Sequence, residues 1–150
     1  MAERSGPFWD AMAGRVSLPP AAVTLGFELL RVDPDAGELE AAFTATEAFL
    51  NPAGAVQGGF LAAMLDDTMG PALVATLASD EWAPTLELKI SFLRSAYPGR
   101  LVGCGRVVHR AGGVAFLAGE LRDETGMLLA TATATARIGS SGRSVRGDPS

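Results

Sequence analysis

The sequence predicts an α+β fold in which one long, buried helix is covered by a curved antiparallel β-sheet. Residues 58–78 (GGFLAAMLDDTMGPALVATLA) are rich in Ala, Leu and Met and lack alternation, which indicates a helix. Residues 85–95 change to period two, with Leu88 and Ile90 on one face and Lys89 on the other, as in a strand. Hairpin turns follow, which indicates antiparallel pairing. A helix that is apolar nearly all round must be covered on most sides, and one curled sheet does this.

Three elements are expected before the long helix. Residues 1–20 indicate a short helical segment that Pro19-Pro20 ends. Residues 22–33 and 38–45 are predicted to be strands, joined by the turn sequence DPDAG into a hairpin. A loop containing proline and glycine then leads into the helix.

The elements after the helix are predicted to be strands in one sheet. Besides 85–95, these strands are residues 100–110, 113–123 and 127–138, with Gly-containing turns between them. Residues 139–150 form a polar Gly/Ser-rich tail without core residues, which we expect to be disordered. The predicted organisation is therefore a helical segment (1–20), one domain (21–138) and a tail (139–150).

Composition limits the function classes. The chain has 150 residues, 48% of them hydrophobic and 19% charged, which favours one compact domain over a disordered chain. A net charge of −5 argues against nucleic-acid binding. A single Cys, Cys104, and a single His, His109, exclude a disulfide framework and a Cys or His metal cluster. The first residues lack the apolar segment of a signal peptide, and no apolar run is long enough to span a membrane, so we expect a cytoplasmic protein without membrane contact.

Two adjacent acids, Asp66 and Asp67, lie in the middle of the apolar helix. Consecutive helical residues point about 100° apart, so the two carboxylates cannot share a face. An ionised carboxylate is expensive to bury without partners. Either both acids line a solvated edge of the helix or cap a break in it at Thr68–Gly70, or one of them has a chemical role.

The loop before the helix, from Asn51 to Gly59, ends in Gly-Gly. Glycine allows close approach of a ligand, and the free N–H groups at a helix start favour an oxyanion. Such an entry can bind the oxygen of a reacting acyl group, although Gly-Gly before a helix is also common as a simple tight turn. Cys104, between two glycines in a predicted strand, is interpreted as a small buried residue.

The segment NPAGAVQGGFLAAMLDDTMGPAL resembles the active-site loop and central helix of hotdog-fold acyl-CoA thioesterases, in the branch similar to phenylacetyl-CoA thioesterases. That pattern has an Asn, a Gly-containing loop, His-Gly-Gly, and an acid nine residues after the His. Here Asn51 stands six residues before Gln57, and Asp66 stands nine after it. The segments TLELKISFLRSAYPG and VVHRAGGVAFLAGELRDETGMLLATATAT resemble the later strands, so the resemblance covers roughly residues 20–138.

The resemblance implies roles for individual residues. Asp66 matches the catalytic acid, and Gly58 matches the residue whose N–H polarises the thioester carbonyl. Asn51 matches a polar residue that places the water or acyl group, and Thr85 matches a hydroxyl that orients the water. Asp67 matches no catalytic position and is expected to be structural.

One departure from the pattern is Gln57, which stands where the family has His. Its amide can hold the loop or the thioester but cannot act as a general base. Gly59 and Phe60 are expected to contact the substrate. Arg94 and Arg110 are candidate partners of the CoA phosphates, and the alternative is that both are solvated surface residues. His109 is either a surface or structural residue or a contact of the CoA nucleotide.

The implied function is hydrolysis of an acyl-CoA to free CoA and a carboxylic acid, with Asp66 as general base or nucleophile and without a metal or cofactor. The resemblance also implies a homodimer or homotetramer, in which edge strands pair and each site combines Gln57 and Gly58 of one chain with Asp66 and Thr85 of the other. Two alternatives remain: a non-catalytic acyl-CoA-binding module, and a hotdog hydratase or dehydratase.

Overall fold

The computed structural model describes residues 4–141. Its helices are α1 (Pro7–Met12), α2 (Pro20–Leu25), the 3-10 helix η1 (Glu47–Phe49) and α3 (Gly58–Val74). Its strands are β1 (Glu28–Asp33), β2 (Glu38–Ala45), β3 (Glu81–Trp82), β4 (Thr85–Phe92), β5 (Gly99–Ala111), β6 (Val114–Asp123), β7 (Leu128–Arg137) and β8 (Gly139–Ser140). No helix within this described part of the chain is long and apolar enough to cross a membrane.

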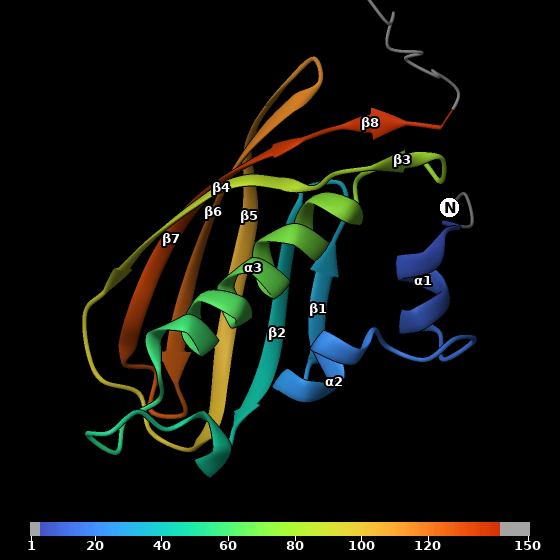
Figure 1. Cartoon of the computed structure of the whole chain (residues 1–150). Coiled ribbons are helices and arrows are strands. Elements are labelled where there is room, and N and C mark those ends of the chain that lie inside the picture. The colour runs from blue at the N-terminus through green and yellow to red at the C-terminus, as the bar shows by residue number, and fades with distance from the viewer. Residues whose placement is uncertain (1–3, 142–150) are drawn as a thin grey trace, which may run out of the picture.

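Six strands form one antiparallel sheet in the order β1-β2-β5-β6-β7-β4. The sheet curves behind α3, which lies diagonally across it (Figure 1). The predicted α+β architecture, a long central helix wrapped by a curved antiparallel sheet, is confirmed. Within one chain, β1 and β4 are the two edge strands of this sheet.

Glycines in β5 and β6 let α3 lie directly on the backbone of the sheet. A Cβ atom added to Gly105 would lie 2.8 Å from the carbonyl oxygen of Thr68, and one added to Gly119 would lie 2.9 Å from Cγ of Met69. A Cβ atom on Gly103 would collide with the Thr68 side chain. Thr68 and Met69 are fully buried as a result. The helix is therefore held at a distance that only glycine permits.

We expect Gly105→Ala to lower the free energy of unfolding by about 2 kcal/mol or more, because the obstructing atom is backbone and cannot rotate away. Urea unfolding at fixed protein concentration measures this. Gly70→Ala is the matched control: no heavy atom lies within 4 Å of its added Cβ, and Ala in a helix is favoured by about 0.5–1 kcal/mol. Equal unfolding midpoints for Gly105→Ala and the unmodified protein would refute the close packing of α3.

The strand predicted over residues 22–33 is wrong in its first half. Residues Pro20–Leu25 form α2, and β1 begins only at Glu28. Pro20 stands at the first helical position, where its fixed φ suits a helix and its missing N–H needs no partner. Gly26, with a φ of 67°, ends the helix in the left-handed conformation. These two local signals outweigh the apolar run that suggested a strand.

The first residues of the predicted tail are ordered. Gly139–Ser140 form β8, which pairs with β3. A Cβ atom on Gly139 would lie 2.6 Å from the indole ring of Trp82, so the glycine makes room for that ring. Residues 142–150, for which disorder was expected, lie outside the described residues.

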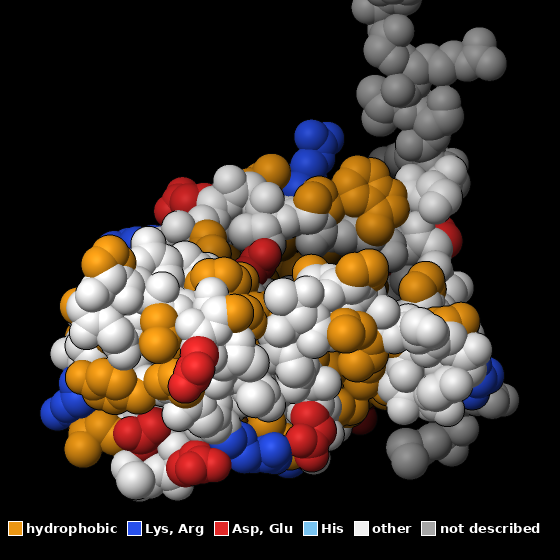
Figure 2. Space-filling view, turned by 60° about the horizontal axis from the view of Figure 1, so that its bottom comes forward, with side chains coloured by type: hydrophobic (Ala, Val, Ile, Leu, Met, Phe, Trp, Pro, Cys, Tyr) orange, Lys and Arg blue, Asp and Glu red, His pale blue; other side chains and the backbone are white. Residues whose placement is uncertain are grey.

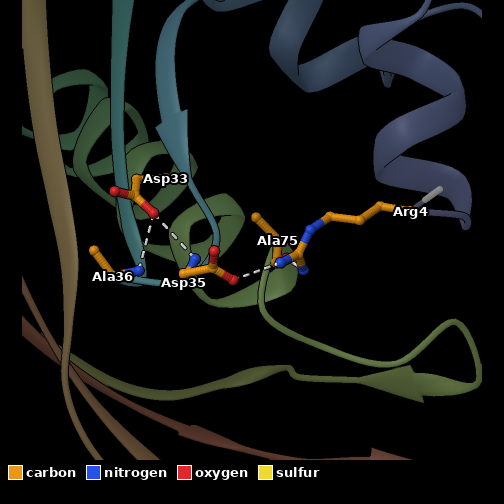
Figure 3. Close-up of polar contacts among 5 residues, drawn as sticks. All are labelled: Arg4, Asp33, Asp35, Ala36 and Ala75. Carbon is orange, nitrogen blue, oxygen red and sulfur yellow. Dashed lines mark hydrogen bonds and ion pairs between the residues drawn. The ribbon is translucent and has the colours of Figure 1, made fainter. Parts of the chain in front are cut away.

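Arg4 links the N-terminal segment to the C-terminal end of α3 and to the β1–β2 turn (Figure 3). Asp33 closes the β1–β2 turn by accepting hydrogen bonds from the N–H groups of Asp35, at 3.1 Å, and Ala36, at 3.0 Å. The guanidinium of Arg4 contacts the Asp35 carboxylate at 2.9 Å and donates to the carbonyl oxygen of Ala75 at 3.2 Å. Ala75 caps the C-terminus of α3, where a cation is favourable.

The interpretation of Cys104 as a buried residue is wrong, because its side chain is exposed. Gly103 and Gly105 take the positions that face α3, so the pleat turns Cys104 to the outer face of the sheet. There it lies between Glu40 and Glu120 in register. Partial burial, and then these two carboxylates, raise the pKa of its thiol.

Candidate active site

Asp66 and Thr85 meet across the gap between α3 and the start of β4. The Thr85 hydroxyl donates a hydrogen bond to Oδ1 of Asp66 at 2.9 Å. Both residues line a pocket of about 430 Å³ between α2, α3 and the segment that joins β3 to β4. Apart from three polar side chains, those of Asp66, Asp67 and Thr85, its walls are glycine and apolar residues. The structure therefore brings together two of the residues that the sequence singled out.

Asp67 lines the same pocket and is the more strongly perturbed acid. Burial, and next the neighbouring Asp66, raise the pKa of Asp67 to about 6. Its Oδ2 atom is inaccessible to solvent and has no hydrogen-bond partner within residues 4–141. No Lys, Arg or His stands among the described residues that line the pocket. Folding therefore shifts the equilibrium of Asp67 towards its protonated form.

This raised pKa predicts a pH-dependent effect of Asp67→Asn. A carboxyl whose pKa rises from 3.8 to about 6 on folding destabilises the protein increasingly as the pH rises through that range. The shift corresponds to about 3 kcal/mol at most, and to about 1–2 kcal/mol after allowance for the partial exposure of the group. We expect the stability advantage of Asp67→Asn to grow by about 1–2 kcal/mol between pH 4 and pH 8, measured by urea unfolding.

The control for this measurement is Asp80→Asn, which changes an exposed loop carboxylate in the same way. We expect its stability relative to the unmodified protein to vary little over the same pH series. An advantage of Asp67→Asn that stays constant with pH would contradict the burial argument.

Asn51 and Gly58 belong to a second pocket, of about 400 Å³, at the N-terminal end of α3. Oδ1 of Asn51 accepts hydrogen bonds from the N–H groups of Ala53, at 3.0 Å, and Ala55, at 3.1 Å. The side chain thus closes its own loop, as Asn does in turns. The loop is also held by a hydrogen bond from the N–H of Gln57 to the carbonyl oxygen of Phe49 at 2.8 Å.

The start of α3 presents free backbone donors. Gly58 is its first residue, and within residues 4–141 the N–H groups of Gly58 and Gly59 have no hydrogen-bond acceptor. Gln57, at the N-cap position, is exposed, and its side chain makes no capping hydrogen bond. The unpaired N–H groups carry the positive end of the helix dipole and suit a developing oxyanion.

The remaining candidate residues lie at different places. Phe60 stacks on Phe49, with ring centroids 4.1 Å apart, and so packs η1 against α3. Arg94 lines the Gly58 pocket and donates to a backbone carbonyl at 3.2 Å. Arg110 lines neither pocket and forms an ion pair with Glu81 at 3.0 Å.

Two further aromatic residues, His109 and Phe92, differ in whether they line one of the pockets. His109 is exposed on the outer part of β5 and lines neither pocket. Phe92, which the sequence did not single out as a site residue, lines the Gly58 pocket. The sequence feature that could have identified Phe92 is its place on the apolar face of β4, directly before Leu93-Arg94.

The two pockets are separate in a single chain. Gly58 and Asp66 are eight residues apart on one helix, which corresponds to about 12 Å along its axis. Among residues 4–141, none lines both pockets. An oxyanion donor and a base must both lie about 3 Å from the reacting atoms. If Gly58 and Asp66 have the roles that the sequence predicts, one chain does not bring them to the same carbonyl.

Comparison with known proteins gives a consistent assignment. The family model of the thioesterase superfamily matches residues 53–130. A phenylacetic acid degradation-related protein from Ralstonia eutropha JMP134 is 45% identical, with a TM-score of 0.84; the match covers 87% of this chain and 98% of that one. None of the curated proteins matches significantly.

Two more distant structures share the fold. The PaaI protein from the phenylacetic acid degradation operon of E. coli is 21% identical with a TM-score of 0.77, over 89% of this chain and 94% of that one. A Streptococcus mutans UA159 protein bound to acetyl-CoA is 23% identical with a TM-score of 0.69, over 76% and 89% of the two chains. The family match and the 45% identical relative carry the conclusion: this chain belongs to the thioesterase superfamily, and it is a thioester hydrolase with the hotdog fold.

Proposed function

We propose that the protein hydrolyses acyl-CoA thioesters to free CoA and a carboxylic acid, at sites that two copies of the chain form together. The observation that carries the proposal is the hydrogen bond from Thr85 to Asp66 in a largely apolar pocket. It presents one oriented carboxylate to a space lined by few other polar groups. The solved relative that holds acetyl-CoA supports a CoA thioester as the substrate class.

The two-copy site follows from the separation of the pockets. A base and an oxyanion donor about 12 Å apart on one helix can serve one carbonyl only if a second chain supplies the missing half. A two-fold axis beside the edge strand β4 achieves this if the two α3 helices run antiparallel and overlap by about half their length. Gly58 of each chain then lies near Asp66 of the other, and two equal sites result.

The edge strand itself supports this arrangement. In the part of the chain that the structure describes, β7 is the only strand paired with β4, so the other side of the β4 backbone has no strand partner there. Leu86 and Phe92, at its two ends, are 61% and 54% exposed. Hydrophobic side chains lie at several places on the face shown in Figure 2. Pairing of β4 with its copy satisfies the backbone groups and covers apolar surface, and the resulting dimers can pair again into a homotetramer.

Catalysis then needs only groups that this chain supplies. The N–H of Gly58 donates to the thioester oxygen as negative charge develops on it. Asp66, oriented by Thr85, either accepts a proton from the attacking water or itself attacks the carbonyl carbon. In both routes the C–S bond breaks and CoA leaves as the thiolate; in the second, water hydrolyses the mixed anhydride. The exposed side-chain amide of Gln57 holds the thioester without exchanging a proton, while its backbone N–H ties down the loop.

Contacts to the CoA phosphates are proposed for Arg94 at the rim of the Gly58 pocket. Arg110 is the weaker candidate, because Glu81 already neutralises its charge at 3.0 Å.

A panel of acyl-CoAs with aromatic, medium-chain and branched acyl groups tests the proposal. Release of the CoA thiol is measured with a thiol reagent, double-bond absorbance is followed in parallel, and binding is measured by calorimetry. We expect thiol release from at least part of the panel. Binding without release would indicate a non-catalytic module, and a double-bond signal without release would indicate a hydratase; either result would overturn the proposal.

A further inference from the structure

We propose that the ring of Phe92 limits the size of the acyl group that the site accepts. The inference rests on the proposed function, because it gives a role in substrate selection to one wall of the pocket beside the Gly58 N–H, the proposed oxyanion donor. The direct observation is the contact between the two residues. A Cβ atom added to Gly58 would lie 3.0 Å from Cζ of Phe92, and 3.3 and 3.4 Å from its Cε atoms. The distal edge of the ring therefore points at the start of α3.

The pocket beside this contact is suited to an acyl chain. Val56, Leu61, Leu93 and Ala96 contribute apolar surface, and the volume is about 400 Å³. An acyl group whose carbonyl oxygen accepts a hydrogen bond from Gly58 has its first carbons next to the Phe92 ring. The ring therefore occupies space that a longer or broader acyl group needs.

The backbone around Phe92 is anchored independently of its ring. Phe92 pairs with Ala130 of β7 at the end of β4. The next two N–H groups, of Leu93 and Arg94, both donate to the carbonyl oxygen of Leu129, at 2.8 and 3.1 Å. The N–H of Val56 donates to the carbonyl oxygen of Ala96 at 2.9 Å, which ties the Asn51 loop to the same segment.

In a single chain the ring is 54% exposed and lies outside the core, so its removal opens the pocket without leaving a core cavity. Because the proposed β4 pairing covers part of this ring, light scattering verifies that each Phe92 variant assembles like the unmodified protein. Phe92 is therefore a position where size can change while the backbone of the site stays in place. This combination is what a specificity-determining residue requires. Each methylene that gains burial contributes about fourfold to binding, so a few added carbons produce a measurable change in preference.

The test is kcat/KM for straight-chain acyl-CoAs from butanoyl to dodecanoyl, for the unmodified protein, Phe92→Leu and Phe92→Ala. We expect the ratio of long-chain to short-chain kcat/KM to rise at least tenfold in Phe92→Ala and by a smaller factor in Phe92→Leu. Tyr97→Ala is the matched control, because Tyr97 is also an exposed aromatic residue of this segment but lines a different pocket. Its chain-length profile should not change.

A double variant isolates the contact. Gly58 does not have a positive φ, so Ala is allowed there conformationally, and the three atoms nearest to its added Cβ all belong to the Phe92 ring. We expect Gly58→Ala to lower kcat/KM about tenfold or more and the Gly58→Ala, Phe92→Ala pair to recover part of that loss. An unchanged chain-length profile in both Phe92 variants would overturn the inference while leaving hydrolysis established. Absence of hydrolysis in the unmodified protein would instead overturn the proposed function.

Discussion

Asp66→Asn is expected to lower kcat by about 100- to 10,000-fold, because the amide can neither accept a proton from water nor attack the carbonyl carbon. The hydrogen bond to Thr85 can be retained, since the amide oxygen still accepts it, and the fold should be unaffected. The measurement is kcat on the best acyl-CoA of the panel, with circular dichroism and light scattering to verify fold and assembly.

Asp67→Asn is the control for this loss, because it makes the same chemical change one residue away. Asp67 lines the same pocket but accepts no hydrogen bond at its buried Oδ2 atom from residues 4–141. We expect this variant to change stability more than rate. If Asp67→Asn were inactive and Asp66→Asn nearly normal, the catalytic acid would be Asp67 and the assignment of Asp66 would be wrong.

Mixing two inactive variants is expected to restore activity. Gly58→Val places a branched side chain against the Phe92 ring and disrupts the oxyanion half, while Asp66→Asn disrupts the other half. If subunits reassort freely, half of the dimers are hybrids, and each hybrid has one intact site of two. The mixture should therefore recover about a quarter of the unmodified activity, as two-fold symmetry requires. Each variant alone should remain inactive.

The reciprocal mixture gives an independent check. A double variant, Gly58→Val with Asp66→Asn, makes both sites of a hybrid dimer defective if each site takes one half from each chain. Equal amounts of this variant and the unmodified protein should then show about half of the input activity after reassortment. Unchanged activity in this mixture, together with no recovery in the first, would show that each chain contains a complete site. Light scattering should report a dimer or tetramer, and a fully active monomer would refute the shared site.

Local sequence signals were sufficient for the main elements of the fold. The helical composition of residues 58–78 and the alternation after residue 85 both have short periods, so they appear within one window of the chain. The strand predicted at 38–45 has the same bounds in the structure. The spacing of Gly58 and Asp66 along one helix likewise follows from the sequence alone.

Local signals also explain the main error. The segment 22–25 has an apolar run that suits a strand, but Pro20 and Gly26 provide the start and the end of a short helix. Cys104 shows a different kind of failure. Which face of a strand meets the helix depends on the helix position, and the sequence does not specify that position.

What the sequence by itself determined is the class of fold, the order of most elements and the placement of Asp66 and the Gly-Gly entry on one helix. Only the tertiary structure decided three contacts: the hydrogen bond from Thr85 to Asp66, the ion pair of Arg110 with Glu81, and the packing of the Phe92 ring against Gly58. Each of these contacts joins residues from different elements. Their distances depend on strand register, on the curvature of the sheet and on how closely glycine lets α3 approach it, and those quantities are set by packing across the whole chain.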